Sequence, residues 1–82
     1  MQETTVHDNF NVHYLDGDED TSVKAAFQYL QNKERFKLSD ARDKFGNAHS
    51  DGESILTFTQ GGVDHTVKIM HDGGNNFRIK PL

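Results

Sequence analysis

Cationic side chains are concentrated between positions 33 and 44 of this 82-residue sequence, and they are its clearest candidates for binding chemistry. Clustered Lys and Arg side chains attract phosphates or acidic protein surfaces, because their summed charge raises the local concentration of anions. Acidic residues are interspersed with them, so a solvated and internally paired surface is the competing interpretation. We expect contacts with a partner at four of the cations, Arg35, Lys37, Arg42 and Lys44.

A second charged segment precedes this cluster, and its aspartates Asp16, Asp18 and Asp20 occupy positions 1, 3 and 5 of a calcium-loop pattern. The pattern then fails, because Thr21 stands where the loop needs Gly and Phe27 stands where it needs a bidentate Glu. The segment is therefore predicted to be a solvated acidic turn that caps a helix and offers a second contact patch.

Other residue types that carry catalysis or metal binding are scattered along the chain. The five histidines lack the helical pairing or closed spacing of a zinc site, and the chain contains no cysteine. No serine lies in a Gly-x-Ser-x-Gly elbow, and neither Gly61-Gly62 nor Gly73-Gly74 is followed by a predicted helix that could hold a phosphate. We therefore expect no catalytic residues, no metal and no cofactor, and a protein that is not an enzyme.

Hydrophobic periodicity predicts the elements that position the charged groups. Apolar and polar residues alternate from 9 to 15, which predicts a strand. Apolar residues then recur at helical spacing from Val23 to Leu30, and Asp20, Thr21 or Ser22 can cap that helix.

The segment from Arg35 to Gly46 fits two interpretations. Phe36 and Leu38 alternate as in a strand, whereas Leu38, Ala41 and Phe45 repeat as in a helix that would stop at Gly46. Both alternatives stay open at this point, and a polar loop is predicted from 47 to 53.

The C-terminal part predicts a three-stranded meander. Strands at 54–60 and 63–71 are joined at Gly61-Gly62, and a turn at 72–75 leads into a short strand at 76–80. The fold class is α+β: one amphipathic helix, with a second short helix if 36–46 is helical, packed on an antiparallel sheet. The predicted core comprises Phe10, Val12, Tyr14, Val23, Ala26, Phe27, Leu30, Leu38, Leu56, Phe58, Val67, Ile69, Phe77 and Ile79.

Length and composition predict a single small domain over residues 1–82, with residues 1–8 as a flexible N-terminal segment. No apolar stretch is long enough to cross a bilayer, so we expect no membrane partner. We expect a monomer in the cytoplasm, with an exported mature form as the alternative.

With 36–41 as a strand, the chain from about Tyr14 onward resembles the front part of a Src-homology-two domain, a family that binds phosphotyrosine. In that family a strand reading Phe-Leu-Val-Arg-(Asp/Glu)-Ser follows the first helix, and Phe36-Lys37-Leu38-Ser39-Asp40-Ala41 stands in that place. Segments 56–58, 67–71 and 74–79 resemble the family's central meander. Ser39 replaces the phosphate-gripping Arg and the family's second helix is missing, so the resemblance implies a related fold without the bidentate phosphate contact.

These features predict a small non-enzymatic interaction module of the adaptor, inhibitor or immunity type. It would bind another macromolecule, most readily a protein, through a charged patch, with Tyr29 or Phe45 as an aromatic contact. The alternative is winged-helix-like nucleic-acid binding through segment 33–44. The formal net charge of −4 and the absence of Lys and Arg from the 60–64 hairpin tip disfavour it.

Overall fold

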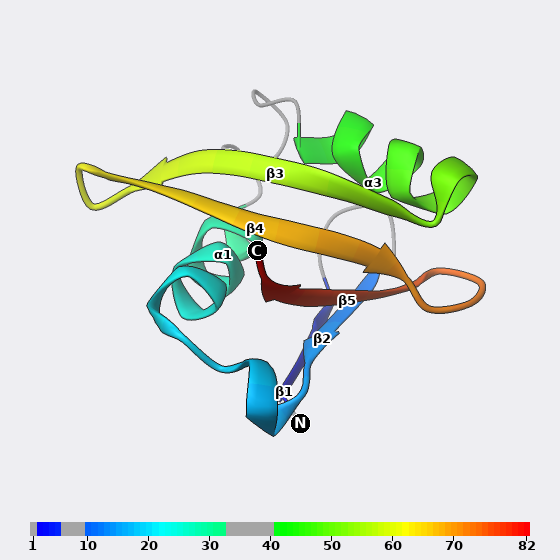
Figure 1. Ribbon diagram of the computed structural model, residues 1–82, viewed down its shortest axis with the longest axis horizontal. Coiled ribbons are helices and arrows are strands. Elements are labelled where there is room, and N and C mark those ends of the chain that lie inside the picture. Colours follow the sequence, from blue (N-terminus) through cyan, green and yellow to red (C-terminus); the bar gives the residue numbers. More distant parts are fainter. Residues whose placement is uncertain (1, 6–9, 33–40) are drawn as a thin grey trace.

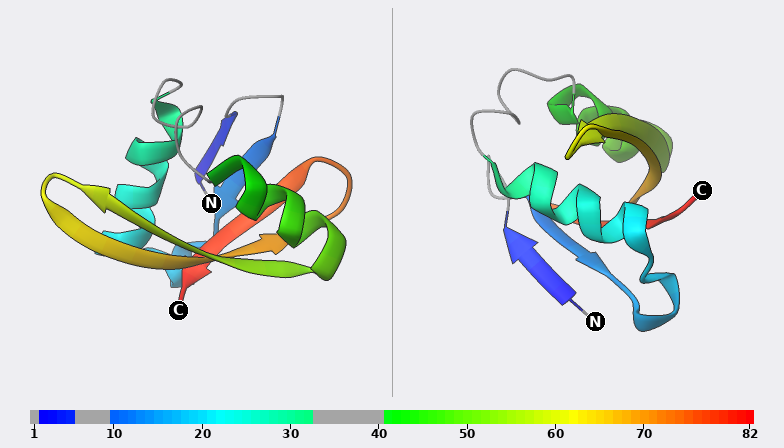
Figure 2. Two further views of the ribbon diagram at one scale, coloured as in Figure 1. Left: turned by 90° about the horizontal axis from the view of Figure 1, so that it is seen from above. Right: turned by 90° about the vertical axis from the view of Figure 1, so that its left-hand side faces the viewer.

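The computed structural model describes residues 2–5, 10–32 and 41–82. In these ranges the chain forms one five-stranded sheet with the order β1-β2-β5-β4-β3, and two α-helices cover one of its faces (Figures 1 and 2). The α+β class is thereby confirmed. The elements are β1 Gln2–Thr5, β2 Asn11–Tyr14, the 3₁₀ turn η2 Asp16–Asp18, α1 Thr21–Gln31, α3 Ala41–Asp51, β3 Glu53–Gln60, β4 Val63–His71 and β5 Asn76–Pro81.

The C-terminal meander has the predicted connectivity. Strands β3, β4 and β5 pair antiparallel in sequence order. Gly61 and Gly62 join β3 to β4 with φ angles of 63° and 79°, a left-handed conformation that glycine adopts without steric cost and that two-residue hairpins require.

The expectation of an antiparallel sheet is wrong at one place, the pairing of β2 with β5. These strands run parallel, with Asn11 opposite Asn76 and Val12 opposite Phe77. The two described helices and the β3–β4 hairpin lie between them in the sequence, and β5 runs beside β2 in the same direction. The sheet is therefore mixed.

Within the N-terminal segment expected to be flexible, residues 2–5 form strand β1, while residues 1 and 6–8 lie outside the described ranges. Strand β1 pairs antiparallel with β2, with Thr4 opposite Val12. The sequence of β1 is polar and lacks the apolar alternation that would indicate a strand. Its place in the sheet comes from backbone hydrogen bonds that complete the outer side of β2.

Helix α3 differs most from its prediction. It begins at Ala41 and continues through Gly46 to Asp51, so Gly46 is not a helix stop and residues 47–51 are not a loop. The reason is packing: Ala41, Phe45 and Ala48 are completely buried, which outweighs the roughly 1 kcal/mol that glycine costs inside a helix. Residues 36–40 lie outside the described ranges.

The actual end of α3 is at Gly52, which has a φ of 93°. The Gly52 amide donates a hydrogen bond to the Ala48 carbonyl at 2.8 Å, and the Gly52 carbonyl accepts one from the His71 amide at 2.9 Å. No helix of the described residues has the length and apolar character needed to cross a membrane.

The core lies between the sheet and the helices. Rings of Phe10, Phe45 and Phe77 meet with centroids 5.0 to 5.2 Å apart and join α3 to β5. Twelve predicted core residues are buried, Phe10 is partly buried, and Leu38 lies outside the described ranges. Further buried residues are Ala25, Tyr29, Ala41, Phe45 and Ala48, so Tyr29 and Phe45 are core residues and the expectation of exposed aromatic contacts is wrong.

Candidate functional site

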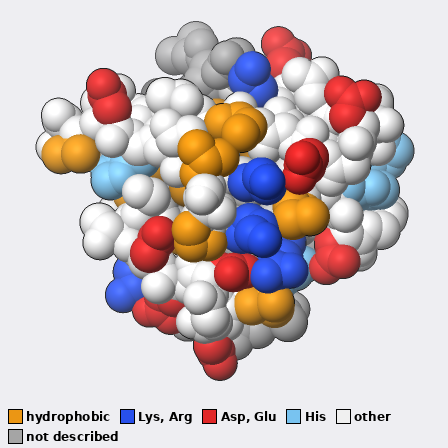
Figure 3. All heavy atoms as spheres, viewed as in Figure 1, with side chains coloured by type: hydrophobic (Ala, Val, Ile, Leu, Met, Phe, Trp, Pro, Cys, Tyr) orange, Lys and Arg blue, Asp and Glu red, His pale blue; other side chains and the backbone are white. Residues whose placement is uncertain are grey.

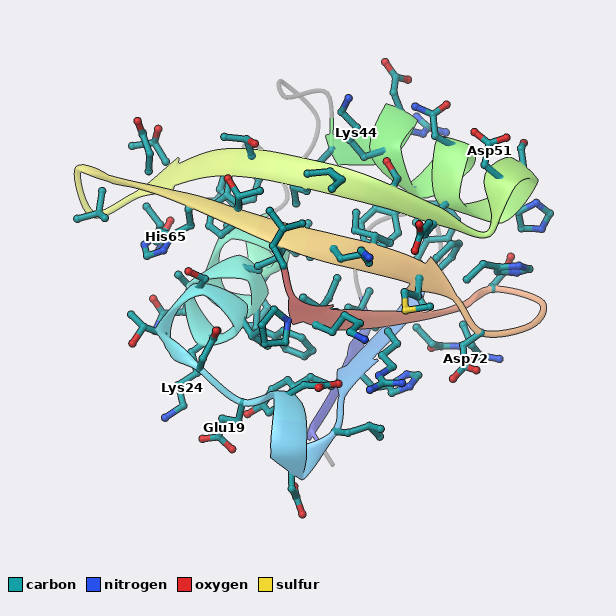
Figure 4. The ribbon with its side chains drawn as sticks, viewed as in Figure 1. Glu19, Lys24, Lys44, Asp51, His65 and Asp72 are labelled. Carbon is teal, nitrogen blue, oxygen red and sulfur yellow. The ribbon has the colours of Figure 1, made fainter. Side chains whose placement is uncertain are left out.

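The predicted basic contact residues fall partly within the described structure. Arg42 and Lys44 lie in the first half of α3, where Arg42 is exposed and Lys44 half-buried, whereas Arg35 and Lys37 lie outside the described ranges. Acidic residues share the exposed surface of the helix at Asp43 and Asp51 (Figure 4). The described part of the predicted cluster is therefore a surface of mixed charge.

The predicted acidic turn is used mainly inside the fold. Asp20 caps α1, as expected, because its Oδ1 accepts a hydrogen bond from the Val23 amide at 2.8 Å. The Lys24 ammonium lies 2.9 Å from the Glu19 carboxylate, and this hydrogen bond raises the pKa of Lys24 (Figure 4). Asp18 accepts a hydrogen bond from the Arg78 Nε at 3.0 Å. All four acids of the turn, Asp16, Asp18, Glu19 and Asp20, therefore interact with other groups of the chain.

The face of the sheet opposite the described helices carries a second group of cations. Residues of β4 and β5 that alternate with the core residues lie on this open face. The pairing register places Lys80 opposite Lys68, and Lys68 opposite Ile55 on β3. Figure 3 views this face and shows Lys and Arg side chains in a row across its middle, with hydrophobic side chains beside them.

A neighbouring row of the open face carries compensated charges. There the register places His13 opposite Arg78, and Arg78 opposite Met70. Arg78 is paired with Asp18, and the His13 Nε2 lies 3.1 Å from the Asp72 carboxylate. This row therefore contributes polar and apolar contact area and little net charge.

Lys68 and Lys80 form the part of the open face with excess positive charge. Lys68 lies 3.4 Å from the Glu53 carboxylate, and its side chain is 30% exposed. Lys80 makes no ion pair with the residues the structure describes. Like charges directly opposite each other on neighbouring strands destabilise a sheet. An anionic group placed between the two ammonium groups would remove that repulsion.

Apolar side chains flank the lysine pair. Ile55 is 46% exposed in the same row, and Met70 lies half-exposed in the next row. Among the described open-face residues there is no Phe, Tyr or Trp on which a nucleic-acid base could stack. The open face therefore combines two cations with exposed aliphatic groups.

One serine and one histidine meet at the other end of the molecule. Ser22 Oγ lies 3.2 Å from His65 Nδ1, beside a hollow of about 340 Å³ between α1 and the β3–β4 hairpin. Nucleophilic serine chemistry also needs an acid that orients the histidine, and no carboxylate of the described residues contacts His65. The pair therefore links α1 to β4 without forming a described triad.

Two further histidines meet beside the β4–β5 turn. The rings of His49 and His71 have centroids 4.4 Å apart, and the His71 Nε2 donates to the Gly74 carbonyl at 2.8 Å. Within residues 2–5, 10–32 and 41–82, no three His, Asp or Glu side chains gather in a way that could hold a metal ion.

The open face was missed at the sequence level, although a signal for it was present. Lys68, Arg78 and Lys80 alternate with the predicted core residues of two predicted strands, and such positions face away from the core. Their proximity depends on the β4–β5 register, which sequence alternation does not specify.

Comparisons with protein-family models, with curated proteins and with solved structures find no match to this chain. The resemblance to Src-homology-two domains stays a prediction.

Proposed function

We propose that this chain is a non-enzymatic binding module that holds an acidic protein partner on the open face of its sheet. The observation that carries the proposal is the direct opposition of Lys68 and Lys80 next to exposed Ile55. An acidic side chain of the partner would lie between the two ammonium groups, while an apolar neighbour would cover Ile55 and Met70.

The proposed role of the lysines is electrostatic selection of the partner. Such charges raise the rate of encounter and disfavour basic partners, and an exposed pair contributes about 0.2 to 1 kcal/mol. The exposed aliphatic groups would supply the area that is removed from water. Arg42 and Lys44, on α3, are secondary candidates for contact.

A titration observed by NMR tests this proposal. We expect a short synthetic peptide of alternating Glu and Leu to shift the amide signals of Ile55, Lys68 and Lys80, with an affinity that falls as salt is added. Replacing both lysines with Ala should weaken binding about tenfold, since two pairs of about 0.7 kcal/mol are lost. Lys24→Ala is the matched control, because Lys24 is an exposed lysine on α1, and it should bind as the wild type does.

A single-stranded RNA oligonucleotide is the competing probe. Tighter binding of RNA, with shifts at Arg42 and Lys44, would support the winged-helix-like alternative and contradict the proposal. Peptide binding that is unchanged in the double lysine variant would also contradict it, as would no binding of the peptide at all.

A further inference from the structure

The outer edge of β3 is regular, and no described strand pairs with it. All eight residues of β3 pair with β4 in one unbroken register, so the strand contains no bulge. It carries neither Pro nor Lys, the residues that commonly block edge-to-edge association. In the order β1-β2-β5-β4-β3 this strand is the last of the described sheet.

The backbone groups that point outward from this edge can be identified. Gln60 and Val63 flank a two-residue turn, so their backbones exchange hydrogen bonds. In an antiparallel pair such bonded positions alternate, so every second residue of β3, counted from Gln60, bonds its backbone to β4. The hydrogen bond from the His71 amide to the Gly52 carbonyl fits this alternation, because Gly52 is an even number of residues from Gln60. Residues 53, 55, 57 and 59 therefore direct their backbone groups away from β4.

The central outward groups have no partner in the described structure. The backbone amides and carbonyls of Ile55 and Thr57 make no hydrogen bond with the described residues. Figure 2 (left) looks onto this edge and shows the half of β3 next to the hairpin extending away from α3. The backbone groups of Ile55 and Thr57 can therefore form hydrogen bonds with an additional strand.

We propose that a second copy of this chain pairs with this edge, β3 against β3, in a twofold-symmetric antiparallel dimer. With the axis at Leu56, Ile55 lies opposite Thr57 of the second copy, and Thr57 lies opposite Ile55 of the second copy. The two central pairs then exchange about four backbone hydrogen bonds. No like charges oppose each other, because residues 54–59 are uncharged.

Symmetry and composition favour a second copy over a foreign segment. An antiparallel strand pair with a twofold axis is self-complementary, and closed twofold dimers are the commonest oligomers. The strand offers no charge between 54 and 59 with which to select a different partner. The sequence alone favours a monomer, and the β3 edge is the structural reason for proposing a dimer.

Dimerisation would extend the open face across the twofold axis. The second copy contributes its own lysine pair, and Ile55 lies between the two pairs. A partner with two acidic segments could then contact both copies, which strengthens binding through effective concentration. The dimer itself does not depend on the proposed function, because its contacts are those of the β3 edge.

Sedimentation velocity and light scattering on the full chain test the dimer from about 10 µM to about 1 mM. We expect the mass to rise from 9.3 kDa toward twice that value. Thr57→Pro removes an outward amide and leaves the ladder to β4 intact, so it should stay monomeric. Thr57→Ala keeps the amide and is the matched control, which should dimerise.

A second variant and a second readout cover the case in which Thr57→Pro does not fold. Ile55→Glu places a charge on the exposed edge and should also give a monomer. In wild-type protein the amides of Ile55 and Thr57 should exchange with solvent more slowly at higher concentration. Those of Leu56 and Phe58 bond to β4, so their protection should not require the second copy.

Three outcomes would overturn the dimer: a monomer mass up to about 1 mM, unchanged association in both edge variants, or concentration-independent exchange at Ile55 and Thr57. Failure of the proposed function is distinct. Replacing Lys68 and Lys80 with Ala should weaken the salt-sensitive binding of the acidic peptide about tenfold and leave the mass of the dimer unchanged.

Discussion

Removing the charge of Lys80 is expected to stabilise the fold, although it should weaken binding. Lys80 lies opposite Lys68. Two like unit charges at a separation of about 6 Å would repel by about 0.7 kcal/mol at the dielectric constant of water. Cross-strand pair energies of about 0.2 to 1 kcal/mol have the same size. We therefore expect Lys80→Gln to raise the free energy of unfolding by about 0.5 kcal/mol. Lys80→Glu, which changes repulsion into attraction, should raise it by about 1 kcal/mol.

Urea denaturation measures this effect. For a domain of this size the free energy of unfolding falls by about 1 kcal/mol per molar urea. The urea midpoint should therefore rise by about 0.5 M for Lys80→Gln and by about 1 M for Lys80→Glu. Added salt should shrink both gains, because it screens half-exposed charges. Lys24→Gln is the control and should not stabilise the fold, because it removes the attractive contact with Glu19. A Lys80→Glu variant less stable than wild type, or a gain that persists in high salt, would refute the reasoning.

Two further changes test local features by thermal or urea unfolding. Gly46→Ala should stabilise the protein by about 0.5 to 1 kcal/mol, because Gly46 lies inside α3 and a Cβ there meets no atom within 4 Å. Gly62→Ala is the contrasting variant and should destabilise the protein by about 1 kcal/mol, because Gly62 has a left-handed φ of 79°. Equal effects at both glycines would contradict a helical Gly46 and a left-handed Gly62. Asp20→Ala should cost about 1 kcal/mol through loss of the α1 cap, whereas Asp20→Ser should retain most of it, and an unchanged midpoint for Asp20→Ala would show that the cap contributes nothing.

Elements with strong local periodicity could be predicted. The strand around Val12, the helix capped by Asp20 and the Gly61-Gly62 hairpin were all found near their expected places, because hydrophobic alternation and turn chemistry act over a few residues. The segment 35–46 stayed open between a strand and a helix, and its helical alternative stopped at Gly46. The burial of Phe45 and Ala48 against the sheet decides that Gly46 is inside a longer helix. Strand β1 had no periodic signal at all.

The candidate site, too, could be predicted from the sequence only in part. The sequence states that Lys68 and Lys80 alternate with core residues and therefore face away from the core. Only the antiparallel register of β4 with β5 decides that they face each other, and only the strand order places Ile55 beside them and makes β3 the last strand of the described sheet.

Sequence alone thus determined the α+β class, most of the core and the direction in which residues of the predicted strands point, because these follow from periodicity along one segment. Tertiary structure decided the parallel β2–β5 pair, the length of α3 and the lysine pair of the open face. These depend on contacts between segments far apart in the chain, whose energies come from packing and register, and those terms are not encoded in any single local pattern.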